Sequence, residues 1–230
     1  FISSTIIRKA IQAEHDLDTF LPKTAGTLIL QNNLYKITNT NCQKKSSFQS
    51  DLNLSCQELM KKLEESAMLL IMLLKELENN KKPHRFSIVE TSTGGKIAGE
   101  FTSQSGASNH FIDGRILYSK ESQMKFLRQS FTSKPSVSET MVKNLAESMR
   151  NFSGSDWSLA ETSMAGPPSN NKRSQKNGQC HLGLALTSEV QYKFLELNPF
   201  LTRKEHQLLI SIEALNWAKN VLEKLFLKKK

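Results

Sequence analysis

Two segments of this sequence constrain its fold more than any other part. Residues 88–95 read Ile-Val-Glu-Thr-Ser-Thr-Gly-Gly, and residues 160–167 read Ala-Glu-Thr-Ser-Met-Ala-Gly-Pro. Each pattern predicts a strand that runs into a turn of small residues. Such a turn leaves backbone N–H groups free at a helix start, where a phosphate or a carboxylate can bind. Strands that alternate with helices in this way predict an α/β domain.

The hydrophobic pattern places this domain at residues 56–230, with a mixed sheet layered between helices. We expect helices at about residues 55–79, 94–102, 120–128, 138–151 and 202–227. We expect strands at 86–89, 111–118, 156–160, 181–187 and 190–195, and a long loop at 166–178. Helix caps are predicted at three positions, the first of them in a capping box with Glu58: Ser55, Ser138 and Thr202.

Residues 1–55 are predicted to form an N-terminal extension. Residues 1–22 carry an amphipathic helical pattern, and residues 27–30 and 34–37 flank Gln31-Asn32-Asn33 as a predicted β-hairpin. The stretch 38–55 is rich in Asn, Ser, Lys and Gln, which bury little surface on their own. We therefore expect the extension to contact other protein subunits, and RNA where the assembly contains it.

The net charge of +9 lies entirely in residues 81–230, which hold 22 Lys and Arg against 13 Asp and Glu. A basic surface can bind RNA, anionic lipid or acidic protein, or it can simply be solvated in a basic compartment, and both interpretations remain open. No aromatic residues interleave with the basic ones, so we expect any RNA contact to be made to phosphates. The candidates lie in the loop and at the C-terminal end: Lys172, Arg173, Lys176, Lys228, Lys229 and Lys230.

The remaining composition argues against several classes of site. The longest apolar run, residues 67–74, is much shorter than the roughly 20 residues of a membrane span. The three cysteines and most histidines show no metal-ligand spacing, so we expect no metal, no cofactor and a reduced compartment. Glu205-His206 is interpreted as helix surface. Phe1-Ile2-Ser3-Ser4 resembles the start left by removal of a mitochondrial presequence, so we expect the mitochondrial matrix, with the cytoplasm as the alternative.

Residues 64–226 resemble the CinA C-terminal domain family of competence-damage proteins. The family's Glu-Ser-Cys-Thr-Gly-Gly is similar to residues 90–95, and its Tyr-Ser-Asn-Glu-Ala-Lys to residues 118–123. Its Thr-Gly-Ile-Ala-Gly-Pro is similar to residues 162–167, and its Gly-Asp-Arg-x-x-x-Arg to residues 201–207. The similarity runs without gaps from Glu90 to Pro167.

Bacterial members of this family deamidate nicotinamide mononucleotide, with a serine nucleophile, a lysine and tyrosine that manage the proton, and basic groups for the phosphate. Here Thr91 stands at the serine position and Gln123 at the lysine position, and an amide cannot accept the proton. If the chain is active, the resemblance implies a catalytic set of Thr91, Tyr118 and Lys120, with Lys120 as a shifted base one helical turn earlier. The implied substrate- and phosphate-binding positions are Thr93, Gly94, Gly95, Ala165, Gly166 and Arg203.

Two further departures predict a smaller pocket, because Ser163 adds a Cβ where the family has glycine and Pro168 lacks a backbone N–H. We therefore expect a non-catalytic CinA-like protein, a pseudoenzyme that serves as a structural subunit of a larger assembly, with the mitochondrial ribosome and its rRNA as the leading case. The alternative is a nicotinamide mononucleotide amidohydrolase of NAD metabolism with an altered nucleophile and base. Ligand binding without turnover lies between these two, and a nucleotide is a partner only if the pocket is retained.

Overall fold

The computed structural model describes residues 54–128, 136–166 and 177–227, so the helix and hairpin predicted for the N-terminal extension lie outside it. The helices are α3 (Cys56–Asn79), α4 (Lys96–Thr102), α5 (Lys120–Phe126), α6 (Glu139–Ser153), α7 (Arg203–Phe226) and the 3-10 helix η3 (Ala107–Asn109). The strands are β1 (Phe86–Glu90), β2 (Phe111–Ile116), β3 (Trp157–Ser163), β4 (Gln179–Ala185) and β5 (Val190–Glu196).

The five strands form one mixed sheet in the order β2-β1-β3-β4-β5, which confirms the predicted α/β fold. Strand β1 is parallel to both of its neighbours, β2 and β3. Strands β3, β4 and β5 are antiparallel to one another in turn. Because β2, β1 and β3 run the same way, the loops that follow them meet at one edge of the sheet.

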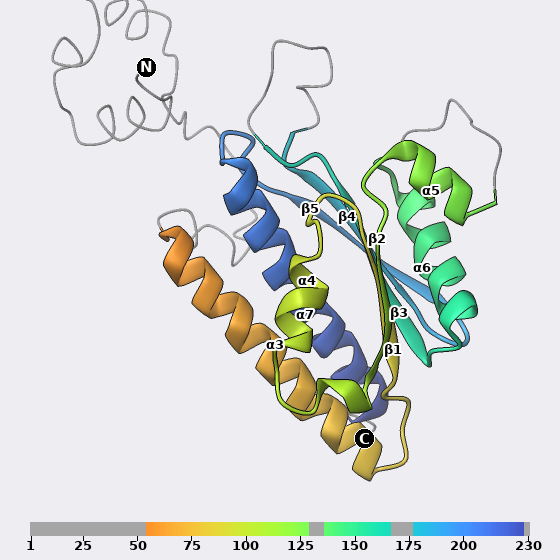
Figure 1. Ribbon diagram of the computed structural model, residues 1–230. Helices are drawn as coiled ribbons and strands as arrows, with labels where there is room; N and C mark the ends of the chain where they lie inside the picture. Colours follow the sequence, from red (N-terminus) through yellow and green to blue (C-terminus); the bar gives the residue numbers. More distant parts are fainter. Residues whose placement is uncertain (1–53, 129–135, 167–176, 228–230) are drawn as a thin grey trace, which may run out of the picture. The chain divides into compact units, whose positions relative to one another are not determined.

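Helices cover both faces of this sheet (Figure 1). Helices α5 and α6 lie on one face, where Gly183 of β4 lets α6 approach closely: a Cβ there would come 2.9 Å from the carbonyl oxygen of Val142. Helices α4 and α7 lie on the other face, and α3 packs against both of them. Under this second layer, the ring of Phe86 stacks on Trp157 at a centroid distance of 4.4 Å and meets Phe101 edge-on at 4.6 Å.

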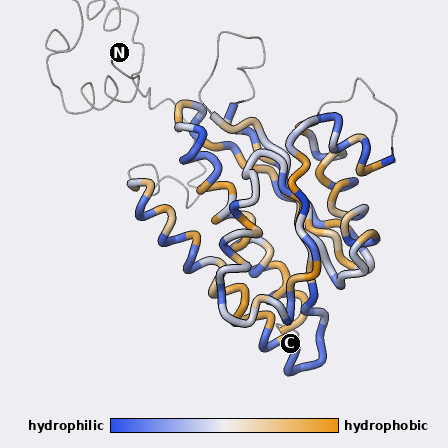
Figure 2. Tube along the Cα trace, viewed as in Figure 1, coloured by the Kyte–Doolittle hydropathy of each residue, from blue (hydrophilic) through white to orange (hydrophobic). Residues whose placement is uncertain are grey.

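The predicted caps are confirmed. The side chains of Ser55 and Thr202 each accept a backbone N–H and face a reciprocal glutamate in a capping box, while Ser138 accepts from Met141. The alternation of charged and apolar residues along α3 can be followed in Figure 2, and the apolar stretch 67–74 lies within this helix, before the charged residues Lys75, Glu76 and Glu78. Within the described ranges, no helix is long and apolar enough to cross a membrane.

Several predicted boundaries differ by about two residues, as at the end of β2 (Ile116 instead of residue 118) and in β4 (Gln179–Ala185 instead of 181–187), and two others were wrong for physical reasons. Helix α4 begins at Lys96 rather than at Gly94, because Gly94 and Gly95 have φ angles of +66° and +92°, which a right-handed helix excludes. Strand β3 continues past Ala160 to Ser163, because β4 pairs with it as far as the Ser163–Cys180 pair. This extension places Glu161 inside the sheet.

Candidate functional site

The site positions implied by the family resemblance meet at the carboxyl edge of the parallel strands. Residues 91–95 follow β1, Tyr118 follows β2, and Ala165 follows β3. Arg203, the first residue of α7, joins two of these loops: its Nη2 donates to the Tyr118 hydroxyl at 3.0 Å, and its Nη1 donates to the Ala165 carbonyl at 2.8 Å. The structure therefore brings Tyr118, Ala165 and Arg203 together as one connected group.

A buried carboxylate, that of Glu161, organises the loop after β1. Its Oε1 accepts the backbone N–H groups of Thr91 at 2.6 Å and Thr93 at 2.9 Å. Its Oε2 accepts the Ser92 hydroxyl at 3.1 Å, and that hydroxyl also contacts Ser163 Oγ. Thr91 and Ser92 are buried. The backbone of the predicted nucleophile is therefore held in place by a residue of β3.

The N–H groups at the start of α4 are bonded within the protein. The carboxylate of Glu90 accepts those of Gly95 at 2.9 Å, Ile97 at 3.2 Å and Ala98 at 2.7 Å. The structure thus differs from the prediction of free N–H groups at this turn, because the last residue of β1 bends back and takes the place that an external anion would occupy.

Thr93 lies between the two buried glutamates. Its Oγ1 is 2.7 Å from Glu90 Oε2 and 2.8 Å from Glu161 Oε1. A hydroxyl carries a single proton, so at any moment it donates to only one of the two carboxylates. Burial, the largest influence, raises the pKa of Glu90 despite its hydrogen bonds with Ala98, Thr93 and Ile97, and the charge of Glu161 acts in the same direction as burial. The surroundings therefore disfavour the charged form of Glu90.

This raised pKa gives a pH-dependent contribution to stability. The folded state binds the Glu90 proton more tightly than the unfolded chain, so the contribution is complete below pH 4.5, the usual pKa, and is lost as the pH rises through the folded-state value. We expect Glu90→Gln to gain stability relative to the unaltered chain as the pH rises over this window. Urea unfolding at a series of pH values measures the difference between the two proteins.

Comparing the two proteins isolates the contribution of Glu90 to the pH dependence of stability. Burial also lowers the pKa values of His110 and His206, but it does so in both proteins equally. Glu147→Gln on the exposed side of α6 is the matched control and should run parallel to the unaltered chain. A Glu90→Gln curve that also runs parallel would show that the pKa of Glu90 does not differ between the folded and unfolded states.

Gln123, at the family's lysine position, is 3% exposed. Its Nε2 donates to the Leu117 carbonyl at 3.1 Å, and its Oε1 is buried with no hydrogen-bond partner among the described residues. Lys120 is the half-buried first residue of α5, while the side chain of Tyr118 is mostly exposed. The buried side chain at the family's lysine position is therefore an amide, which cannot accept a proton.

The start of α7 fixes both turns from the other side. The interpretation of His206 as helix surface was wrong: it is fully buried, and its Nδ1 accepts the N–H of Gly166 at 2.9 Å. Burial lowers the pKa of His206, which agrees with an unprotonated Nδ1. Gln207, where the family motif has its last arginine, donates to the Ser92 carbonyl at 2.7 Å. Helix α7 thus forms a hydrogen bond with each turn, and the one to Ser92 comes from the position of the family's last arginine.

Sequence reasoning missed the organising role of Glu161, although a charged residue within a strand that is otherwise apolar or small was a usable signal. It also missed a cluster of Glu78, His84 and His110 at the other end of the sheet, whose ligand atoms lie within 4.8 Å of one another. Their spacing along the chain shows no pattern, because neighbouring parallel strands bring them together. Pro168 and the six predicted RNA-contact residues lie outside the described ranges, so their roles stay predictions.

Comparison with known proteins gives a consistent result. The sequence model of the CinA C-terminal domain matches residues 69–222. A CinA-like protein from Geotalea daltonii is 32% identical over 139 residues, which cover 59% of this chain and 33% of that protein. A CinA-like protein from Endomicrobium trichonymphae is 34% identical over 122 residues, or 51% of this chain and 28% of that protein. The chain thus spans about a third of the length of these relatives.

Solved structures agree on the fold. The competence/damage inducible protein CihA from Agrobacterium tumefaciens superposes with a TM-score of 0.60 at 23% identity, covering 69% of this chain and 96% of that one. The competence damage-inducible protein A from Klebsiella pneumoniae superposes with a TM-score of 0.62 at 17% identity, covering 70% and 98%. The family model covers well over half of the sequence, and the chain therefore belongs to the CinA C-terminal domain family.

Proposed function

We propose that this chain is a non-catalytic member of the CinA family that serves as a structural subunit of a larger assembly, and that this assembly is the mitochondrial ribosome. The observation that carries the first part is the state of Gln123. It is buried at the position of the family's lysine, and its amide is bonded to the Leu117 carbonyl. A general base typically contributes about 10²–10⁴ in rate, and an amide cannot act as one.

The surroundings of Thr91 support the same proposal. The adjacent hydroxyls of Ser92 and Ser163 are buried in contact with each other and with Glu161, so they are committed to the structure. The N–H groups at the start of α4 are taken up by Glu90. The groups that would attack a substrate or hold its anion are thus largely used within the protein.

An exposed apolar face on α3 supports a role in an assembly. Met60, Met68 and Met72 recur at helical spacing and are 51%, 47% and 59% exposed, and Leu69 beside them is 42% exposed. The opposite side of α3 is buried against α7 and α4, so this face is additional to the core. Methionine side chains adapt to irregular partner surfaces, and a group of exposed apolar side chains is typical of a protein interface. The net charge of +9 supports a neighbour rich in phosphate, as rRNA is.

We expect the combined change Met60→Gln, Met68→Gln and Met72→Gln to release the full chain from its assembly. The tagged chain, expressed in its source cells, should sediment with mitochondrial rRNA in a density gradient, and the triple variant should shift to the light fractions by about tenfold or more. The melting temperature should change little, because exposed substitutions typically alter stability by about 0.5 kcal/mol or less. Phe200→Gln, which changes an exposed apolar residue away from α3, is the control.

Two results would contradict this proposal. If the unaltered chain sediments only in the light fractions, it is not a ribosomal subunit. If the triple variant stays with the rRNA, the α3 face is not the contact.

The alternative function is an amidohydrolase acting on nicotinamide mononucleotide with an altered nucleophile and base. The hydrogen bond between Tyr118 and Arg203 favours it, because Tyr118 follows β2, the strand that pairs with β1, and Thr91 follows β1. This alternative requires Thr91 Oγ1 to attack the amide carbon and Lys120 to take the hydroxyl proton. Release of ammonia from the substrate separates the two functions.

A further inference from the structure

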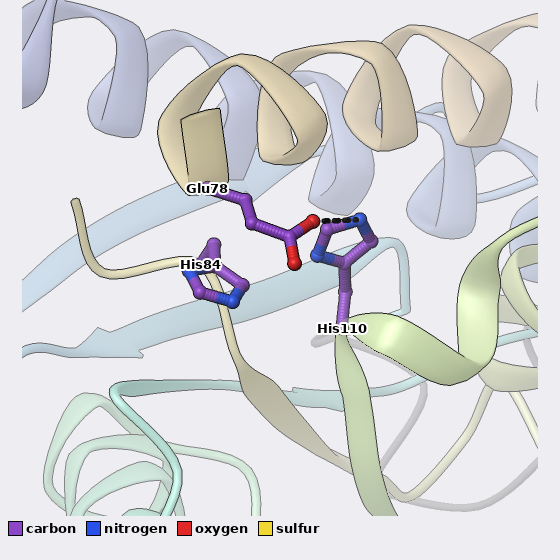
Figure 3. Close-up of side chains that lie close together, drawn as sticks. All are labelled: Glu78, His84 and His110. Atoms are coloured by element: carbon purple, nitrogen blue, oxygen red, sulfur yellow. Dashed lines mark ion pairs between the residues drawn. The ribbon is translucent and has the colours of Figure 1, made fainter. Parts of the chain in front are cut away.

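At the start of the parallel strands, opposite the edge described above, three potential metal ligands lie together (Figure 3). Glu78 is in the last turn of α3, His84 lies in the connection to β1, and His110 immediately precedes β2. Their ligand atoms are within 4.8 Å of one another, and Glu78 Oε2 is 3.9 Å from His110 Nε2. The backbone holds the two histidines in place, since the N–H of Phe86 donates to the His110 carbonyl at 2.8 Å.

The state of His110 is the second observation that points to a ligand. Its side chain is fully buried, and neither ring nitrogen has a hydrogen-bond partner among the residues that the structure describes. The 3.9 Å separation from Glu78 is too long for a hydrogen bond. Buried polar side chains almost always have a partner, so a buried imidazole with two free nitrogens, directed at a carboxylate and a second imidazole, needs an explanation.

The orientation of His84 fits metal binding as well. Its Nδ1 lies 2.9 Å from the carbonyl oxygen of Lys82, so Nδ1 carries the proton and donates it there. This hydrogen bond leaves Nε2 unprotonated and free to bind a cation. Metal-ligating histidines commonly donate their second ring N–H to a backbone carbonyl in this way, which fixes both the tautomer and the ring orientation.

We propose that Glu78, His84 and His110 bind a divalent transition-metal ion, with Zn²⁺ as the best match. Two imidazole nitrogens and one carboxylate oxygen are a ligand set that zinc takes, with water in the fourth position. Zinc bonds of about 2.0–2.2 Å require the ligand atoms to draw closer together than 4.8 Å. The side chain of Glu78 is 44% exposed and can make that movement.

The position of the cluster indicates what the ion does. The ion would join the C-terminal end of α3 to the beginnings of β1 and β2. At this end of the strands, the three elements are otherwise linked through the backbone. The cluster lies at the opposite end of these strands from Thr91 and Tyr118, so the ion acts on stability and not on chemistry at the candidate site. A ligand that binds the folded state raises the melting temperature, by an amount that grows with the logarithm of its concentration relative to its dissociation constant.

The test uses the full chain, stripped with a chelator and titrated with Zn²⁺ by calorimetry. We expect one equivalent to bind and the melting temperature to rise. Glu78→Gln and His84→Gln should each weaken binding by at least about tenfold and remove most of the thermal shift. Both residues are at least partly accessible, so these variants should fold; the buried His110 is avoided for that reason. Glu76→Gln, an exposed glutamate of the same helix, is the matched control and should bind like the unaltered chain.

Titration with Co²⁺ gives an independent readout, because a bound cobalt ion with imidazole ligands absorbs visible light. The band should appear with the unaltered chain and with Glu76→Gln, and it should be lost in the other two variants. The proposal is overturned if Zn²⁺ fails to bind at micromolar to millimolar concentration. It is equally overturned if Glu78→Gln and His84→Gln leave binding unchanged, since the ion is then held elsewhere in the chain.

Discussion

No ammonia above the uncatalysed background is expected when the purified chain is incubated with nicotinamide mononucleotide. Hydrolysis of the amide needs a base for the attacking hydroxyl, and Gln123 at the family's lysine position is a buried amide bonded to a backbone carbonyl. Loss of a general base lowers a rate by about 10²–10⁴, and the branched Thr91 in place of serine adds crowding at the attacking atom. An ammonia assay over hours at high protein concentration makes the measurement.

Two variants decide what any observed turnover means. If ammonia release is seen and Thr91→Ala abolishes it, the chain is an enzyme and the non-catalytic proposal is wrong. If Lys120→Gln abolishes it too, Lys120 is the shifted base. Arg203→Gln is a useful third variant, because it removes the hydrogen bond to Tyr118 without touching the nucleophile. Turnover that none of the three variants changes would come from a contaminant.

The largest loss of stability from a single methyl group is expected for Gly178→Ala. Gly178 has a φ angle of +84°, and a Cβ there would lie 2.3 Å from the carbonyl oxygen of Leu197. Its backbone cannot shift easily, because its N–H donates to Met164 and its carbonyl accepts from Leu197, both at 2.9 Å. Left-handed strain of about 1–2 kcal/mol and overpacking of about 1–3 kcal/mol together predict a loss of about 2–5 kcal/mol in urea unfolding.

Substitutions at two other glycines separate the backbone strain from the overpacking. Gly154 is also left-handed, at a φ of +66°, but has no atom within 4 Å of its would-be Cβ, so Gly154→Ala should show the backbone strain alone. Gly99 lies inside α4 with equally open space, and Gly99→Ala should gain about 0.8 kcal/mol from helix propensity. If Gly178→Ala lowers the free energy of unfolding no more than Gly154→Ala does, the contact with Leu197 does not contribute to the loss of stability.

The elements that could be predicted from the sequence are those with a local cause. The two residues of each capping box, Ser55 with Glu58 and Thr202 with Glu205, are only three positions apart in the sequence. The first box was therefore predicted in full, and for the second the cap residue was predicted. The end of β3 could not be predicted in this way, because the strand reaches Ser163 only by pairing with Cys180 of β4. The pairing partner follows β3 in the sequence only after residues 167–176, and nothing within β3 itself indicates it.

The same distinction between local and long-range causes applies to the candidate site. The family resemblance placed Tyr118 and Arg203 in one site, and the structure joins them by a hydrogen bond. The burial of His206, by contrast, depends on how α7 lies against the turn after β3, which no local pattern encodes. The bonds from Glu161 to the loop after β1 depend on the same kind of long-range register. The expected contacts with rRNA and the mitochondrial location remain predictions.

The hydrogen bond between Thr91 and Glu161 has a consequence for the growing chain. These residues are 70 positions apart, whereas Glu90 reaches the amide of Ala98 only eight positions away. As the polypeptide emerges from the ribosome at about 5–20 residues per second, the cap of α4 can close at once, but the other half of the loop must wait several seconds for its carboxylate. During that interval the backbone N–H groups of Thr91 and Thr93 face water. The loop that carries the would-be nucleophile therefore takes its final form only after β3 has joined the sheet and Gln207 of α7 has reached the Ser92 carbonyl.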